Sequence, residues 1–220
     1  MATCADRKQR VFLVDDHALV REWLTSLINQ QDDLEVCGEA ETAAAALTAI
    51  GASNPDVAIV DISLKDHSGI DLIKGLQDSH PTVPVLVLSM HEETHFVERV
   101  LHAGAKGYIM KREATKKVVE GVRQVAKGEL YLSEAVTQAL ATRFVEGRTP
   151  VEHPVIEQLS DRELEVFELL GQAQDPQQIA KKLQINAKTV HTYCARIREK
   201  MKLSSSLELF REAIHWHERG

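Results

Sequence analysis

The sequence predicts an α/β domain built on a five-stranded, doubly wound parallel sheet, followed by a small all-α domain. Short apolar runs alternate with helical patterns through the first 130 residues, which is typical of a parallel sheet covered by helices. Polar residues follow four of these runs directly. Beyond residue 158 the apolar runs stop, and helical segments with clear start signals take their place.

The expected strands are short and mostly apolar, as are strands buried on both faces of a parallel sheet. They are Arg10–Val14, Leu34–Gly38, Asp56–Val60, Val83–Leu88 and Gly107–Met110. Apolar residues at helical spacing follow each strand. The expected helices cover 19–28, Glu41–Ile50, Ile70–Gln77, Glu93–His102 and Thr115–Lys127. This alternation predicts the doubly wound arrangement.

Composition indicates a globular protein of a reducing compartment. Hydrophobic residues make up 44% and charged residues 27% of the chain, which is ordinary for a globular domain. Cys4, Cys37 and Cys194 lie far apart, without disulfide-framework or metal-ligand spacing. The N-terminal MATCADRKQR has no apolar signal core, and Val85–Met90 is too short to span a bilayer. We therefore expect a cytoplasmic protein without a membrane segment.

Charge is distributed unevenly along the chain. The net charge is −7, which by itself argues against a nucleic-acid binder. However, Leu159–Gly220 contains 10 Lys and Arg against 9 Asp and Glu, which leaves 16 basic and 24 acidic residues elsewhere. A segment of net +1 beside a remainder of net −8 indicates that the two parts have separate tasks.

A change of pattern separates these parts. Glu129–Glu146 reads as a further helix, whereas Gly147–Gln158 contains two prolines and little periodicity. We therefore predict a first domain over residues 8–130, a linker with a helical first half over residues 131–158, and a helical domain over residues 159–220.

The helical domain contains a helix-turn-helix pattern. Ser160 and Glu163 have the spacing of a capping box. Asp175, followed by a proline, caps a second helix, and Asn186 caps a longer one that runs to Met201. Two helices joined by about three residues, the second of them basic, are typical of this motif.

Polar side chains gather at one edge of the predicted sheet. Asp15, Asp16, Asp61, Ser89 and Lys111 follow strand ends that meet at the same edge. Three carboxylates repel one another unless a cation relieves them, and all-oxygen ligands suit Mg²⁺. A carboxylate nucleophile, for which Asp61 is the lead candidate, can attack a phosphoryl group. The competing interpretation is a set of unrelated strand-end acids with a salt-bridging lysine.

Several spaced motifs carry a family resemblance. In the first part they are VDDHALVRE, VDISLKDHSGIDLI, VLVLSMHEE, GAKGYIMK and GELYLS. In the second they are LSDRELEVFELL, IAKKL, AKTVHTY and IREKMKL. From about Arg10 to Gly128 the chain resembles the flavodoxin-like receiver domain of a two-component response regulator. To about Trp216 it resembles the NarL/FixJ type, with a C-terminal LuxR-type helix-turn-helix.

The resemblance implies that Asp61 is a phosphoacceptor, phosphorylated by a sensor histidine kinase. It also implies that Mg²⁺ is bound by Asp15, Asp16, Asp61 and the backbone carbonyl of Ser63. Lys65 stands where the family usually has a proline. A lysine there alters metal affinity or phosphoryl lifetime in a direction that the sequence leaves open.

The resemblance further implies a switch. Lys111 contacts the phosphoryl group, the Ser89 hydroxyl follows it, and the ring of Tyr108 moves inward. A phosphoryl group adds about −1.5 to −2 charges, which is enough to bias a two-state element. On this interpretation the chain is not an enzyme, apart from its own phosphorylation and dephosphorylation.

The helix after Asn186 has the pattern of a recognition helix. Val190, Cys194, Ile197 and Met201 form an apolar stripe at helical spacing. From residue 188 to 202 there are five Lys and Arg against one Glu. A solvated basic helix is the competing interpretation.

Exposed residues near the start of a major-groove helix read bases, and basic flanks bind phosphates. The expected base contacts are His191, Thr192 and Ala195, and the expected backbone contacts are Lys188, Thr189, Arg196 and Lys200. Ala195 offers only apolar contact, such as that to a thymine methyl. His191 stands where the family often has Lys or Arg.

The leading hypothesis is a phosphorylation-controlled DNA-binding transcription factor. One small module buries little surface on DNA, so we expect a homodimer on paired half-sites when phosphorylated, with RNA polymerase as a further partner. A second hypothesis is a receiver whose degenerate helix-turn-helix acts through protein contacts. A third is an aspartyl-phosphate phosphohydrolase, which typically needs an acid two residues after the nucleophile, where this chain has Ser63.

Overall fold

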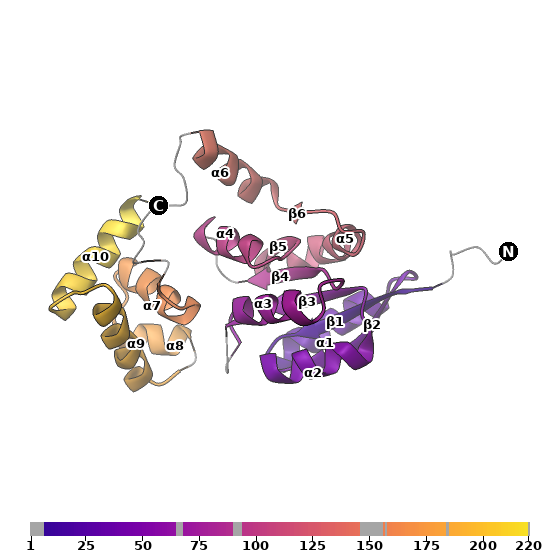
Figure 1. Cartoon of the computed structure of the whole chain (residues 1–220), viewed down its shortest axis with the longest axis horizontal. Coiled ribbons are helices and arrows are strands. Elements are labelled where there is room, and N and C mark those ends of the chain that lie inside the picture. Colours follow the sequence, from indigo (N-terminus) through magenta and orange to yellow (C-terminus); the bar gives the residue numbers. More distant parts are fainter. Residues whose placement is uncertain are drawn as a thin grey trace. The chain divides into compact units, whose positions relative to one another are not determined.

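A computed structural model describes residues 7–64, 68–89, 94–145, 156, 158–183 and 185–219. The chain forms two compact units, Met1–Pro150 and Val151–Gly220, which are coloured indigo to salmon and orange to yellow in Figure 1. Lys65 and, within the predicted linker, residues 146–155 and 157 lie outside the described residues. Within the described part of the chain, no helix is both long and apolar enough to cross a membrane.

The first unit is built on a parallel sheet with the strand order β2-β1-β3-β4-β5-β6. Its strands are β1 (Gln9–Val14), β2 (Leu34–Ala40), β3 (Val57–Asp61), β4 (Val85–Ser89), β5 (Gly107–Met110) and β6 (Tyr131–Leu132). Every residue of β3 and β4 is buried, as the apolar runs predicted. The order reverses between β1 and β3, which creates a crevice outside their carboxyl ends.

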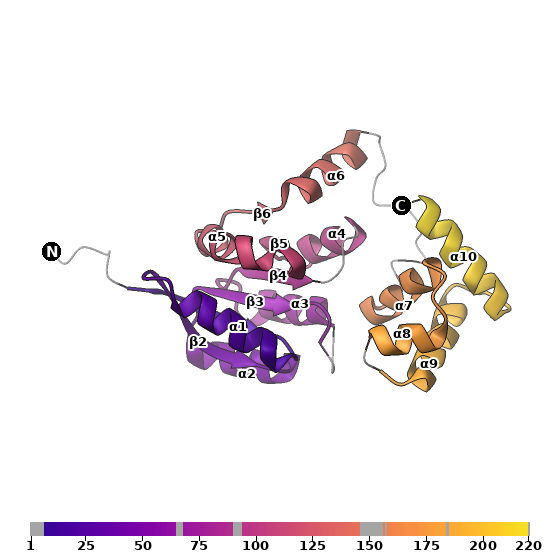
Figure 2. The same cartoon turned by 180° about the vertical axis from the view of Figure 1, so that it is seen from behind.

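Helices lie on both faces of this sheet (Figures 1 and 2). They are α1 (Ala18–Asn29), α2 (Ala43–Ser53), α3 (Gly69–Ser79), α4 (Thr94–His102) and α5 (Ala114–Ala126), with a 3₁₀ turn at Lys111–Glu113. Apolar residues of α1 and α5 share one core with alternate side chains of the strands. Because each fully buried Val, Leu or Ile stabilises the fold by about 1.5–3 kcal/mol, this core holds the sheet edge in place.

The stretch after Lys127 corrects one prediction. Instead of a helix from Glu129, the chain forms β6 and then α6 (Glu134–Val145). Tyr131 pairs with Gly107 at the sheet edge, and its N–H donates to the Lys106 carbonyl at 2.9 Å. Edge pairing and the burial of Tyr131 therefore outweigh a weak local preference for helix.

The second unit contains α7 (Asp161–Gly171), α8 (Pro176–Lys182), α9 (Ala187–Lys200) and α10 (Ser206–Arg219). The predicted start signals of α7, α8 and α9 are all present. Capping boxes open α7 and α8, and the Asn186 side chain accepts from Lys188 N at 2.9 Å. These caps satisfy helix N–H groups that would otherwise lack partners.

A small apolar core joins these helices. Val190 and Ile197 of α9 are fully buried, and the rings of Phe167 and Trp216 lie 5.7 Å apart between α7 and α10. A Cβ atom at Gly171 would lie 2.6 Å from the Ala213 carbonyl oxygen, so α7 ends on a glycine because α10 approaches its backbone closely. The core leaves one side of α9 facing outward.

Candidate functional site

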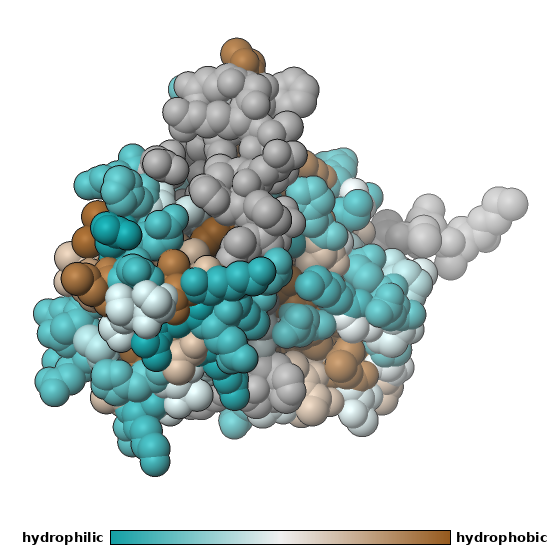
Figure 3. Space-filling model, turned by 60° about the vertical axis from the view of Figure 1, so that its left-hand side comes forward, coloured by the Kyte–Doolittle hydropathy of each residue, from teal (hydrophilic) through white to brown (hydrophobic). Residues whose placement is uncertain are grey.

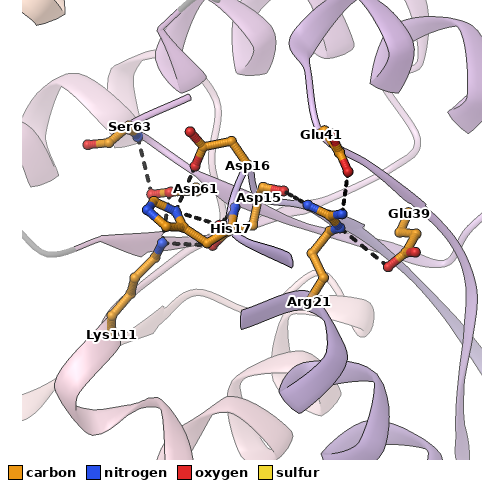
Figure 4. Close-up of polar contacts among 9 residues, drawn as sticks. All are labelled: Asp15, Asp16, His17, Arg21, Glu39, Glu41, Asp61, Ser63 and Lys111. Carbon is orange, nitrogen blue, oxygen red and sulfur yellow. Dashed lines mark hydrogen bonds and ion pairs between the residues drawn. The ribbon is translucent and has the colours of Figure 1, made fainter. Parts of the chain in front are cut away.

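The predicted acidic residues meet at the carboxyl ends of β1 and β3, beside the switch point (Figure 4). Possible ligand atoms of Asp15, Asp16, His17 and Asp61 all lie within 4.8 Å of one another. Lys111 enters from the end of β5, and its Nζ lies 2.7 Å from both Asp15 Oδ2 and Asp61 Oδ2. Parallel topology thus brings together groups that are 96 residues apart in sequence.

The electrostatics of this cluster call for a cation. Burial raises the pKa of Asp61; Lys111 lowers it, and Asp15 raises it again, with a net upward shift. Burial lowers the pKa of Lys111, but attraction by Asp61 and Asp15 outweighs burial and raises it. Lys111 is therefore an ammonium, and three carboxylates with one ammonium leave two negative charges. The oxygen donors of these three carboxylates, with this charge, fit Mg²⁺.

The backbone packs closely around Asp61. The Ser63 N–H donates to Asp61 Oδ1 at 3.2 Å. A Cβ atom at Gly69 would lie 2.2 Å from the Asp61 carbonyl oxygen, so only glycine fits where α3 begins under β3. The Asp61 side chain is itself buried, with 2% exposure.

The two predicted switch residues lie in the sheet core. Ser89 and Tyr108 are fully buried. The register pairs Val87 with Tyr108 and Ser89 with Met110, so Ser89 and Tyr108 project from the same face of the sheet. The ring of Tyr108 is therefore in an inward position in this structure.

The sequence analysis did not identify two neighbours of the cluster, although both lie in the motif VDDHALVRE. His17 Nδ1 lies 2.7 Å from Asp16 Oδ1 and 3.2 Å from Asp15 Oδ1. Arg21 is buried and donates to the Asp15 carbonyl oxygen at 2.7 Å. The sequence signal that could have identified them is their short distance from the aspartates along the chain. His17 directly follows Asp16, and Arg21 lies about one helical turn after His17.

Arg21 also connects the cluster to the segment formed by the carboxyl end of β2 and the residue that follows it. Its guanidinium lies 2.6 Å from Glu41 Oε1 and 3.5 Å from Glu39 Oε2, as Figure 4 shows. Because the arginine is buried and its acidic partners are largely exposed, the pair anchors this segment to the backbone of Asp15.

The outward side of α9 is polar and concave. Of the predicted contacts, Lys188, His191, Thr192, Ala195 and Arg196 are exposed. A surface concavity of about 470 Å³ is lined by Asn186, Lys188, Thr189, Thr192, Tyr193 and Arg196. Among the coloured residues in Figure 3, hydrophilic ones (teal) cover more of the surface than hydrophobic ones. Tyr193 was not among the predicted contacts.

Lys200 differs from the other predicted contacts of α9. Its Nζ donates to Glu163 Oε2 at 2.5 Å and to the Gln158 carbonyl oxygen at 2.9 Å. Burial raises the pKa of Glu163, but Lys200 and the Ser160 N–H outweigh this, and the net shift is downward. The ammonium of Lys200 is therefore paired with a buried carboxylate inside the unit.

Family comparisons match both units. Residues 11–123 match the response regulator receiver domain, and residues 157–213 match bacterial regulatory proteins of the luxR family. The chain belongs to the response regulators of the NarL/FixJ type. This confirms the predicted fold, a flavodoxin-like receiver followed by a LuxR-type helix-turn-helix. The family consists of DNA-binding transcription regulators and not of enzymes, so the phosphohydrolase hypothesis is wrong.

Relatives of similar length support this assignment. The chain is 34% identical to the response regulator GacA of Pseudomonas viridiflava over 200 residues, which cover 91% of this chain and 92% of GacA. It is 32% identical to the oxygen regulatory protein NreC of Staphylococcus carnosus over 209 residues, 93% and 96% of the two chains. Both relatives thus match this chain along nearly their whole length.

Solved structures share the fold. The receiver domain of the putative response regulator NarL from Mycobacterium tuberculosis superposes with a TM-score of 0.54 at 33% identity, and covers 56% of this chain and 99% of that one. The response regulator RcsB in complex with DNA gives a TM-score of 0.58 at 24% identity, over 93% and 97% of the chains.

Proposed function

We propose that phosphorylation of Asp61 controls DNA binding by this transcription factor. The observation that carries the proposal is the convergence of Asp15, Asp16 and Asp61 around one point, with the Lys111 ammonium 2.7 Å from Asp61. A sensor histidine kinase is the expected phosphodonor, and this chain is expected to receive the phosphoryl group in the cytoplasm. An Asp61 carboxylate oxygen attacks phosphorus, the bond from phosphorus to the histidine nitrogen breaks, and the electron pair stays on that nitrogen.

The chain's own residues orient this reaction. Asp15, Asp16, Asp61 and the Ser63 carbonyl would hold Mg²⁺, which supplies charge neutralisation when bound. Lys111 is proposed to pair with phosphoryl oxygens on Asp61, and the position of its Nζ beside that carboxylate supports this role. Ser89 ends the neighbouring strand and is proposed to hydrogen-bond the phosphoryl group. Tyr108, whose ring is already buried here, is proposed as its switch partner.

Phosphorylation is expected to act on the effector through a two-state change. It adds about −1.5 to −2 charges at a buried site, which favours any arrangement that brings donors to the phosphoryl oxygens. The consequence is a change in domain packing or a homodimer that binds paired half-sites and meets RNA polymerase. The domains proposed for this mechanism are the receiver at 8–130, the linker at 131–158 and the DNA-binding domain at 159–220.

We assign DNA reading to α9. His191, Thr192 and Ala195 are proposed to face bases, while Lys188, Thr189 and Arg196 are proposed to contact the backbone. The exposure of five of these residues supports the assignment.

The testing experiment measures intact mass and oligomeric state of the full chain with Mg²⁺ and acetyl phosphate. We expect a phosphoryl adduct and a shift from monomer to dimer. Asp61→Asn should give neither, and Asp16→Asn, which keeps the nucleophile, should slow adduct formation. An adduct of equal yield on Asp61→Asn would contradict the proposal.

A second candidate function is control through protein contacts alone. The presence of His191 and Ala195, which offer no positive side chain of fixed charge, on the exposed side of α9 favours it. Arg196→Ala and Lys188→Ala distinguish the two functions. Loss of duplex binding supports DNA reading, whereas unchanged duplex binding supports the protein-contact function.

A further inference from the structure

The C-terminal end of α9 is tied to the start of α7. Lys200, the last residue of α9, donates to Glu163 and to the Gln158 carbonyl. Glu163 is 3% exposed in its side chain, whereas Lys200 is 37% exposed. We call these three residues the α7–α9 clasp. The Lys200 ammonium is thus bonded within the unit, whereas a lysine that binds a DNA phosphate usually extends into solvent.

Glu163 gives the clasp a fixed anchor. The carboxylate oxygen that accepts from Lys200 also accepts from the Ser160 N–H at 2.8 Å. In return the Ser160 hydroxyl accepts from the Glu163 N–H at 3.3 Å. Because both halves of this capping box are made, the Glu163 side chain has little freedom. Lys200 is therefore attached to a rigid point.

The position of Lys200 on α9 makes this attachment consequential. Val190 and Ile197 bury one side of the helix, and Lys200 lies on the flank between that side and Arg196, one turn after the latter. A rotation of α9 by about 20° would move groups on its surface, roughly 5–6 Å from the axis, by about 2 Å. Hydrogen bonds do not tolerate such a shift.

We propose that Lys200 is a positioning residue, which through Glu163 sets the orientation of α9 for base discrimination and does not bind a DNA phosphate. The inference rests on the proposed DNA-reading function of α9 and removes Lys200 from its predicted backbone contacts. If Lys200 turned to a phosphate, the buried Glu163 carboxylate would lose its ammonium partner, which is unfavourable in a poorly solvated place.

The two roles predict opposite effects of Glu163→Gln. This substitution leaves the side-chain shape but removes the charge that holds Lys200. A positioning role predicts weaker binding to a specific duplex, by about tenfold for the loss of one charge-assisted bond. A phosphate-binding role predicts tighter binding to every duplex, because a freed lysine adds about −0.9 to the slope of log affinity against log salt.

The experiment uses the full chain after treatment with acetyl phosphate and Mg²⁺. The probes are a labelled 30-bp duplex, enriched by the parent protein from a random pool, and a scrambled duplex of the same composition. Affinities are measured at several salt concentrations for Glu163→Gln, Lys200→Gln and the double variant. We expect each to weaken binding to the enriched duplex only, with an unchanged salt slope, and the double to lose no more than either single variant.

Two controls separate positioning from general destabilisation. Ser160→Ala removes the other half of the capping box but leaves the Glu163–Lys200 pair, so it should lower thermal stability while keeping duplex discrimination. Arg196→Gln removes an exposed cation of the same helix, so it should weaken both duplexes and flatten the salt slope by about 0.9.

Two outcomes would overturn the proposal in distinguishable ways. If Lys200→Gln weakens both duplexes equally with a flatter slope, Lys200 binds phosphate and the DNA-reading function stands; this comparison remains decisive if circular dichroism finds Glu163→Gln unfolded. If the parent protein enriches no duplex, the proposed function itself fails, and the clasp proposal with it.

Discussion

The acidic cluster of the receiver and the outward side of α9 use charge in opposite ways. In the cluster, Asp15 and Asp61 are buried and share one ammonium. On α9, Lys188 and Arg196 are exposed, where water screens them individually. Buried charges act as one coupled unit, whereas exposed charges act nearly independently. Stability should therefore respond strongly to substitutions in the cluster and weakly to those on α9.

The largest effect is expected at Lys111. Lys111→Met should destabilise the first unit by about 3–5 kcal/mol at neutral pH, because it leaves two buried carboxylates without their ammonium. Urea unfolding followed by circular dichroism, with a chelator present, measures this loss. Lys111→Arg serves as the control that keeps the charge. An unchanged unfolding midpoint for Lys111→Met would show that the cluster does not act as a coupled unit.

A smaller loss is expected at Arg21. Arg21→Gln removes the donor to the Asp15 carbonyl and separates Glu41 from the cluster, which should lower the free energy of unfolding by about 1–3 kcal/mol. Isothermal titration with Mg²⁺ should also show weaker binding, since Asp15 loses its backbone support. Glu39→Gln, which alters only the longer contact at 3.5 Å, is the matched control. Equal Mg²⁺ affinity in parent and Arg21→Gln would argue against this support.

Asp61→Asn should increase the free energy of unfolding at neutral pH. The gain should be smaller than the losses expected for Lys111→Met and Arg21→Gln. Because burial raises the pKa of the Asp61 carboxyl above its ordinary 3.8, the folded chain binds that proton more tightly than the unfolded chain does. The parent therefore loses stability as the pH rises from 3.8, the pKa of Asp61 in the unfolded chain, through its higher pKa in the folded chain. Asp61→Asn has no proton to lose there and keeps its stability over this range. Thermal unfolding of both proteins from pH 4 to pH 8 without divalent ions measures the difference. We expect the stability advantage of Asp61→Asn over the parent to grow as the pH rises. An advantage that shrinks would contradict the raised pKa of Asp61.

The smallest effect on stability is expected on α9. His191→Ala should change the free energy of unfolding by no more than about 0.5 kcal/mol, since the side chain is exposed. Discrimination between duplexes should nevertheless fall by about 1–3 kcal/mol if the ring contacts a base. Chemical unfolding and duplex competition separate the two quantities. A large loss of stability would show that the exposed side of α9 also contributes to the stability of its unit, contrary to the contrast with the acidic cluster.

Most of the fold could be predicted because local signals agreed with the tertiary arrangement. The apolar run at Val57–Val60 is buried throughout, and the capping signals at Ser160 and Asp175 start helices. The strand β6 could not be predicted in this way. It has two residues, and its stability comes from pairing with a strand more than 20 residues away.

The acidic cluster was predictable in part, because parallel topology sends strand ends to one edge. Asp61 is the last residue of a strand, and Asp15 and Lys111 directly follow strands. The partners of Arg21 could not be predicted, since they depend on how the carboxyl end of β2 lies beside α1. The partner of Lys200 was missed because it depends on how α9 packs against α7.

The sequence by itself determined which residues carry charge, where helices start and which strands are buried, because these properties depend on neighbours along the chain. Only the tertiary structure decided which charges meet. Lys111 is placed between two carboxylates and Lys200 is bonded to Glu163 because packing brings distant segments within a few ångströms. Coulomb and hydrogen-bond energies fall steeply beyond that range, so the same residue type neutralises a buried site in one unit and anchors a helix in the other.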